Sequence, residues 1–157
     1  MAITQAMCTS FKAELMLAVH DFRVTSGDTF KIALYTSTAT IDANTTAYSA
    51  TNEVTGTGYT AGGNTLSRLG VVTNNETAST GTGFTDFSDS VWSAATITAR
   101  GALIYNNTPS ALSNAGATLT NAAVCALDFG SDKTSTAGDF TIIFPAATNT
   151  TAIIRIA

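Results

Sequence analysis

Two β-prone stretches constrain the fold of this chain more than any other feature. Residues 92–107, WSAATITARGALIYNN, and residues 28–37, DTFKIALYTS, are rich in β-branched and aromatic residues, which favour strands. Phe30, Ile32 and Leu34 occupy every second position of the second stretch, the period of a half-buried strand. Further short β-type runs follow, separated by turn residues and without intervening helices. The spacing predicts a mainly β fold, either an antiparallel β-sandwich or a jelly roll.

The N-terminal segment shows a different periodicity. Apolar residues recur at spacings of three and four over residues 4–22, Thr4 suits an N-cap, and no glycine or proline interrupts before Gly27. We therefore expect one amphipathic α-helix at 4–22, with Phe11 and Leu15 on its apolar face. This face is expected to pack on the sheet or on a neighbouring subunit.

The length of 157 residues is typical of a single domain, here 1–157. After the helix, residues 28–157 are expected to form the sandwich. Polar residues and glycines predict a turn region at Gly130–Gly138 that separates two late strands. The same residue types predict three long loops, at 36–50, 56–63 and 106–121.

The charge content excludes several classes of function. Charged residues make up 11% of the chain, and the net charge of −4 does not provide the basic face that nucleic acids require. No apolar run reaches the roughly 18 residues of a membrane span, and the N-terminus lacks the pattern of a secretory signal. Cys8 and Cys125 lie among apolar residues and are expected to be buried free thiols. We expect no nucleic-acid or membrane partner.

Candidate catalytic and metal-binding residues are few. His20, the only histidine, precedes Asp21, but no nucleophile motif accompanies the pair, and a histidine at a helix C-terminus is the simpler interpretation. Aspartates near the 130–138 region and near Trp92 do not match a calcium loop and are typical of turns. Gly56–Gly63 fits neither nucleotide-binding fingerprint and predicts close backbone contacts instead. We therefore predict no enzymatic activity, no cofactor and no metal.

Aromatic residues and one arginine are the better candidates for contacts with other molecules. Tyr59 lies in the centre of the glycine-rich loop and suits an interface anchor. Arg100 lies in an otherwise uncharged strand, so we expect it either to pair within the fold, with Asp128 or Asp86, or to cross a subunit interface. Trp92 is expected in the core, with a sugar-stacking platform as the alternative. The predicted interface residues are Tyr59, Arg100, Tyr48, Phe11 and Leu15.

Several segments of the chain together resemble a family of tailed-bacteriophage virion proteins. TITARGALIYN and GTGYTAGG are the most specific of these segments, and together the segments cover well over half of the chain. They are SFKAEL (10–15) with His20, FKIALYTS (30–37), TAYSATNEVTGTGYTAGGNTL (46–66), WSAATITARGALIYN (92–106), ALDFGSDKTSTAGDFTI (126–142) and IIRI (153–156).

The resemblance implies a structural component of a phage particle, made in the host cytoplasm and located in the virion. A small, acidic, threonine-rich β protein is most similar to the head-decoration (cement) class, which binds the major capsid protein as a homotrimer. The alternative is a tail or neck subunit: a tube, terminator, fibre or baseplate protein. A second alternative, from another class, is a carbohydrate-binding module for host attachment, with Trp92 or Tyr59 as the stacking ring.

Overall fold

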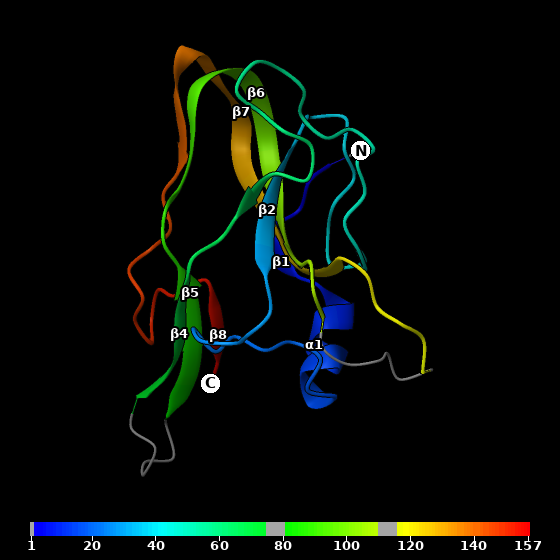
Figure 1. Cartoon of the computed structure of the whole chain (residues 1–157), viewed down its shortest axis with the longest axis vertical. Coiled ribbons are helices and arrows are strands. Elements are labelled where there is room, and N and C mark those ends of the chain that lie inside the picture. Colours follow the sequence, from blue (N-terminus) through cyan, green and yellow to red (C-terminus); the bar gives the residue numbers. More distant parts are fainter. Residues whose placement is uncertain (1, 75–80, 110–115) are drawn as a thin grey trace.

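The protein is mainly β, with two antiparallel sheets and one short N-terminal helix (Figure 1). The structure, a computed structural model, describes residues 2–74, 81–109 and 116–157. This architecture is consistent with a β-sandwich and confirms the predicted fold class. The described elements, in chain order, are β1 (Ala6–Met7), α1 (Thr9–Met16), β2 (Phe30–Tyr35), β3 (Asn64–Thr65), β4 (Arg68–Asn74), β5 (Thr82–Phe87), β6 (Ser90–Asn106), β7 (Ala122–Ile142) and β8 (Ile154–Ile156).

The larger sheet has the strand order β1-β7-β6-β2-β3, and the smaller has the order β4-β5-β8. Strands β6 and β7 are the longest and pair along nearly their whole length, from Ser90 opposite Ile142 to Asn106 opposite Ala122. In Figure 1 this ribbon runs through the upper half of the molecule, whereas α1 and the smaller sheet lie at the lower end. The molecule therefore has two dissimilar ends.

The predicted turn at Gly130–Gly138 is wrong, because these residues belong to β7. Instead, the glycines and polar residues that suggested a turn lie where the pairing of β7 with β6 is irregular. Ala99 lies opposite Lys133 and Gly101 opposite Asp128, so four residues of β7 bulge opposite Arg100 alone. Gly130 has a φ of +72° there, a conformation that glycine adopts readily.

The predicted helix over 4–22 is too long at both ends. Ala6 and Met7 pair with β7 as strand β1, and Cys8 is the extended N-cap residue of α1. The helix ends at Met16, and Ala18 has a φ of +56°, which no right-handed helix allows. Tertiary pairing with β7 has overridden the local periodicity. The predicted apolar stripe is still largely buried, but its C-terminal part, Val19 and Phe22, belongs to an irregular segment.

One buried apolar cluster joins the larger sheet, the helix and the smaller sheet. At the lower end it is aromatic: Phe22 stacks on Phe30 with ring centroids 4.3 Å apart, and Phe87 packs against both. Cys8 and Cys125 are both buried and free, as predicted. Burial raises the pKa of Cys8 to about 11, which keeps this thiol protonated at neutral pH.

The predicted loops at 36–50 and 56–63 both belong to the single connection between β2 and β3. Isolated bridges attach this connection to its surroundings: Tyr35 pairs with Glu53, Ala47 with Ala122 and Thr57 with Thr96. The predicted loop at 106–121 starts one residue later, because Asn106 ends β6. Its residues 110–115 lie outside the described part of the chain.

Candidate interaction site

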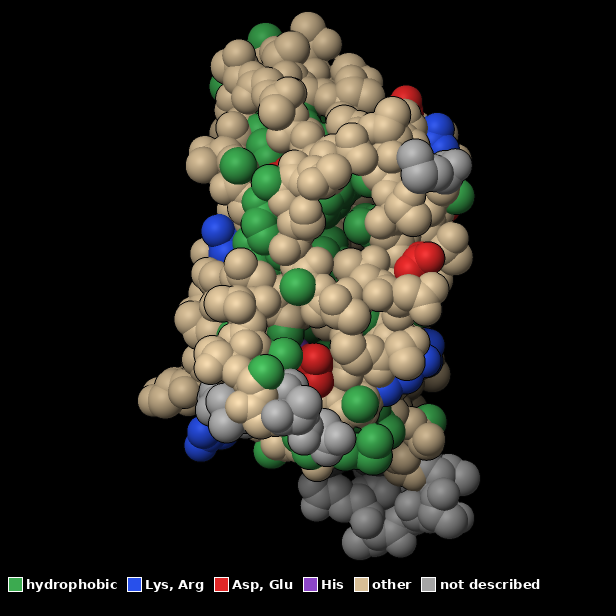
Figure 2. All heavy atoms as spheres, turned by 90° about the vertical axis from the view of Figure 1, so that its right-hand side faces the viewer, with side chains coloured by type: hydrophobic (Ala, Val, Ile, Leu, Met, Phe, Trp, Pro, Cys, Tyr) green, Lys and Arg blue, Asp and Glu red, His purple; other side chains and the backbone are tan. Residues whose placement is uncertain are grey.

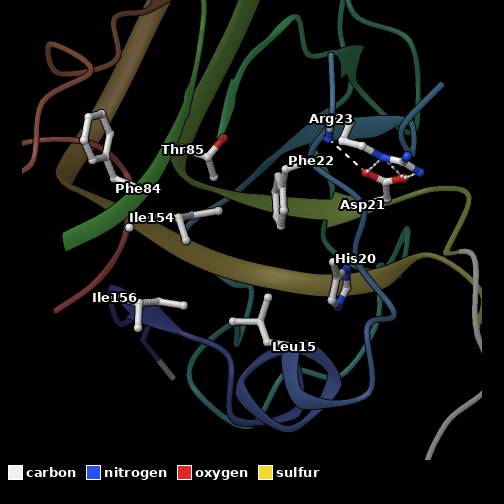
Figure 3. A pocket seen from close by; sticks show the side chains of 10 residues that line it. Leu15, His20, Asp21, Phe22, Arg23, Phe84, Thr85, Ile154 and Ile156 are labelled. Carbon is white, nitrogen blue, oxygen red and sulfur yellow. Dashed lines mark hydrogen bonds and ion pairs between the residues drawn. The ribbon is translucent and has the colours of Figure 1, made fainter. Parts of the chain in front are cut away.

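An apolar cleft at the lower end of the molecule is the candidate site (Figure 3). It lies between α1, the segment after it and the smaller sheet, and its volume is about 340 Å³. Leu15, Phe22 and Ile156 are among the residues that form its walls, and the polar residues His20 and Arg23 also line it. We call it the α1–β8 cleft. Because its walls are mostly apolar, it suits hydrophobic side chains of another molecule.

Two strands and the helix position the apolar walls. In the smaller sheet Thr85 lies opposite Ile154 and Gly83 opposite Ile156, so these residues share one face of the sheet. That face is turned toward Leu15 of α1, as Figure 3 shows. Leu15, a predicted interface residue, is half-buried and lines the cleft, and its interface role stays a prediction.

Exposed hydrophobic side chains surround this end of the molecule. Met16 is 84% exposed and Ile156 59%, and Leu17, Val24 and Leu69 also have large exposed fractions. Figure 2 shows one face of the molecule, on which charged side chains are few and hydrophobic ones gather near the lower end and in a hollow of the upper half. Single exposed apolar residues are ordinary, but a group beside an apolar cleft is typical of an interaction site.

His20 lies beside the cleft in a buried network of polar side chains. Asn106 Nδ2 donates to Asp28 Oδ2 over 2.7 Å and to His20 Nδ1 over 3.1 Å. Since His20 Nδ1 accepts in this network, its Nε2 carries the proton and donates to Glu14 Oε2 over 2.8 Å. Burial lowers the pKa of His20 more than Glu14 raises it.

This network fixes the histidine instead of presenting it to a substrate. Both ring nitrogens are engaged, and the His20 side chain is fully buried. The predicted position at the C-terminus of a helix is wrong, because His20 follows the end of α1 by four residues. The network joins α1 through Glu14, the irregular segment through Asp28 and the end of β6 through Asn106. Its role in this geometry is to hold the back of the cleft together.

A second buried network, centred on Glu53, holds the β2–β3 connection at the upper end. Glu53 Oε1 accepts from the Tyr59 hydroxyl over 2.6 Å and from Gly62 N over 2.7 Å, and its Oε2 accepts from the Tyr48 hydroxyl over 2.6 Å. Tyr105 donates to Gly62 O over 2.8 Å, and Tyr48 stacks on Tyr105. We call this set of residues the Glu53 cluster.

Tyr59 and Tyr48, two predicted interface residues, thus have their hydroxyls bonded within the fold. Tyr59 also accepts a hydrogen bond from Leu34 N and stacks on Trp92 with ring centroids 5.9 Å apart. Burial is the main cause that raises the pKa of Tyr48 and Tyr59, and hydrogen bonding to Glu53 adds to it. Both rings are only partly exposed. An interface role for them stays a prediction, but their structural role is evident.

The glycine-rich loop makes the close backbone contacts that its sequence predicted. Gly63 has a φ of +66°, and a Cβ placed there would lie 1.8 Å from Ile32 O. Gly58 has a φ of +79° and would place a Cβ 2.8 Å from Ala95 Cα. Only glycine lets this loop lie directly on β2 and β6.

The remaining predicted residues lie away from the cleft. Arg100 Nε pairs with Asp132 Oδ1 over 2.8 Å, so neither Asp128 nor Asp86 is its partner. This ion pair joins β6 to the bulge of β7 and is largely exposed, so it contributes less than about 1 kcal/mol. Phe11 is completely buried, and its prediction as an interface residue is wrong. Trp92, at 3% exposure, is a core residue, as preferred from the sequence.

Sequence reasoning missed the residues that matter most at both ends. Glu53 is a lone carboxylate in an uncharged stretch with a tyrosine on either side, and this isolation was the available signal. Ile154 and Ile156 were recognised only as part of the IIRI segment (153–156). No described group of three or more His, Cys, Asp or Glu residues is arranged to hold a metal ion. The helix in the described part of the chain, α1, is too short to cross a membrane.

The fold and the cleft define a mainly β protein with an open apolar site at one end. Comparison of the chain with models of protein families, with curated proteins and with solved structures finds no match. The resemblance to phage virion proteins therefore stays a prediction from the sequence motifs.

Proposed function

We propose that this protein is a non-catalytic structural subunit that binds a larger protein assembly through the α1–β8 cleft. One observation carries the proposal: the buried polar side chains hold the fold together, whereas an open apolar cleft lies at the lower end. Glu53, His20 and Glu14 all have partners within the chain. Asp86, also buried, accepts from the backbone N–H groups of Phe87 and Ile153.

The assembly that we propose is the head of a tailed bacteriophage, with this chain as a capsid decoration protein. The sequence motifs support this choice, as does the shortage of charge in a small threonine-rich β protein. Its partners would be the major capsid protein and further copies of itself, as a homotrimer located in the virion. Weak contacts at each cleft would then be multiplied by the symmetry of the shell.

The proposal is tested by co-sedimentation of the purified protein with expanded, undecorated heads of its own phage. We expect binding that saturates at a fixed number of copies per capsid subunit. Heads that already carry their decoration protein are the matched control and should bind none. Absence of binding to the undecorated heads would reject the decoration role.

A tail or neck subunit is the second candidate, and the topology of the smaller sheet favours it. In the part of the chain that the structure describes, β4 and β8 each pair on one side only, so both edges of this sheet are open. Open edges allow neighbouring copies to join into a ring or tube. Mass photometry of the protein alone distinguishes the two: a ring of three, six or twelve copies that ignores heads would favour the tail or neck.

The two candidate stacking rings give the carbohydrate-binding alternative little support. Trp92 is in the core, and one face of Tyr59 is covered by Trp92. A sugar-stacking ring must be open to solvent. We expect a glycan array to show no binding even at high protein concentration.

A further inference from the structure

We propose that the open edge of β8 is a docking site for an extended segment of a partner protein, in which apolar residues flank an acidic one. This segment would add a fourth strand to the smaller sheet and place its apolar side chains in the α1–β8 cleft. The inference deepens the proposed function and rests on it, because it names the chemistry by which the assembly is recognised.

The edge of β8 is available for pairing. Strand β8 bonds to β5 on one side, through Ile154 opposite Thr85, Arg155 opposite Phe84 and Ile156 opposite Gly83. No described strand lies on its other side. Figure 1 shows that β8 is the strand of the smaller sheet nearest to α1. An exposed edge presents free backbone N–H and C=O groups, which is the basis of peptide recognition by strand addition.

The cleft determines which side chains of the partner suit alternate positions of the added strand. Ile154 and Ile156 point toward the cleft, and Leu15 faces them from α1 (Figure 3). Residues of the partner that lie opposite these two isoleucines point to the same side of the sheet. The volume of about 340 Å³ and the apolar walls suit valine- or leucine-sized side chains at these two positions.

Arg155 determines which residue of the partner suits the position between these two apolar positions. It points to the opposite face from Ile154 and Ile156, is exposed, and forms no ion pair with any carboxylate in the described ranges. Its one hydrogen bond, to Asn149 O, is long at 3.5 Å. In a chain whose net charge is −4, this arginine is left without a negative partner. An Asp or Glu directly opposite it would form a favourable cross-strand pair.

The same arginine argues against a second copy of this chain as the occupant. Two β8 strands paired antiparallel about Arg155 would place the two guanidinium groups opposite each other, and like charges in that position are destabilising. A charged residue in an edge strand is a common device against self-pairing. Pairing of β8 with the β4 edge of another copy is the contact of the tail or neck alternative. For the decoration role proposed above, we therefore assign the β8 edge to a different protein.

The test uses two end-capped nine-residue peptides and NMR of the full-length protein labelled with ¹⁵N. Both peptides carry valine at every second position and threonine or serine elsewhere, with either aspartate or lysine in the centre. We expect the aspartate peptide to shift the amide signals of Ile154–Ile156 and Leu15. The lysine peptide should bind about tenfold more weakly, because attraction to Arg155 becomes repulsion.

Two variants at exposed positions complete the design, and circular dichroism checks that each is folded. Arg155→Glu should reverse the preference, so that the lysine peptide binds about tenfold more tightly than the aspartate peptide. Ile156→Lys should weaken both peptides at least fivefold. Equal affinities for the two peptides, shifts confined to another region, or no binding would each overturn the inference. Concentration-dependent shifts of Ile154–Ile156 without peptide would assign the edge to a second copy instead.

Head binding by Arg155→Glu separates this inference from the proposed function. If undecorated heads bind this variant as well as the natural chain, the decoration role stands and the β8 edge is rejected as its docking site. If heads bind neither protein while the peptides behave as expected, the decoration role is rejected and the edge remains a docking site.

Discussion

The Glu53 cluster and the α1–β8 cleft use the chain in opposite ways. In the Glu53 cluster, a buried carboxylate, two tyrosine hydroxyls and a backbone N–H satisfy one another. In the cleft, apolar side chains from α1 and β8 face a space that no described residue fills. The comparison shows that an aromatic residue in a glycine-rich loop, Tyr59, can have its hydroxyl engaged within the fold, whereas the apolar cleft at the other end is open.

We expect the largest effect on stability from removal of the Glu53 carboxylate in the Glu53 cluster. Glu53→Ala leaves Gly62 N–H and the hydroxyls of Tyr48 and Tyr59 without their acceptor in a buried place. We expect a loss of about 3–4 kcal/mol in the free energy of unfolding, measured by urea denaturation. Asp132→Asn is the matched control, because it breaks an exposed ion pair and should cost less than about 1 kcal/mol. A loss below about 1 kcal/mol for Glu53→Ala would show that the stability of the fold does not depend on the Glu53 cluster.

The glycine-rich loop allows a second test with a closely matched control. Gly63 and Gly130 both have positive φ, at +66° and +72°, but only Gly63 lies against backbone. Alanine at Gly130 should cost about 1–2 kcal/mol, from the left-handed conformation alone. Gly63→Ala should cost about 2 kcal/mol more, because its Cβ collides with Ile32 O. Equal losses in urea denaturation would mean that the loop moves away from β2 at little cost.

Strand positions were predictable from the sequence, whereas element boundaries that depend on distant pairing were not. The period of two identified β2 and most of β6. The expectation that β2 is half-buried is wrong, because both of its faces are covered and only Lys31 is partly exposed. In β6 the alternation of buried and exposed residues holds in the first half, whereas Gly101–Asn106 are all buried. The helix was overestimated because Ala6 and Met7 pair with β7, more than a hundred residues away. Similarly, Gly130 and Gly138 suggested a turn, but a bulge allows β7 to continue through them.

The sites were less predictable than the strands, for a physical reason. Side-chain type identified Tyr48 and Tyr59 as contact residues, but the hidden partner of both is Glu53, and only the folded connection brings the three together. Leu15, predicted on the apolar face of the helix and as an interface residue, is half-buried at the α1–β8 cleft, and its interface role stays a prediction. Phe11, one turn earlier, is completely buried, because the direction in which α1 packs decides which side of its apolar stripe is covered.

We expect a smaller loss of stability when the pH is lowered, because His20 in the polar network beside the α1–β8 cleft becomes protonated. Because burial lowers the pKa of His20 in the folded protein below its ordinary 6.5, the folded state binds fewer protons than the unfolded state. This contribution to stability is fully present above pH 6.5. It declines as the pH falls from 6.5 toward the lowered value, with a slope of at most about 1.4 kcal/mol per pH unit.

Urea denaturation between pH 7.5 and 5.5 measures this slope, and His20 is the only histidine that can produce it. His20→Asn is the control, and its stability should be nearly flat over the same range. An NMR titration of the imidazole that gives a pKa at or above 6.5 would contradict the expected direction.

We expect the smallest effect on stability at the α1–β8 cleft. The contrast with the large effect expected at the Glu53 cluster is the sharpest test of the difference between these two regions. Ile156→Lys changes a residue that is 59% exposed, so the free energy of unfolding should change by less than about 0.5 kcal/mol. The apolar surface of the cleft should nevertheless shrink, and the fluorescence of a bound anilinonaphthalene dye should fall at least twofold. Ile143→Lys, at a residue 76% exposed in a different hollow, should leave the dye signal unchanged. If both variants lower the signal equally, the dye reports general surface hydrophobicity and the α1–β8 cleft has no special capacity for apolar groups.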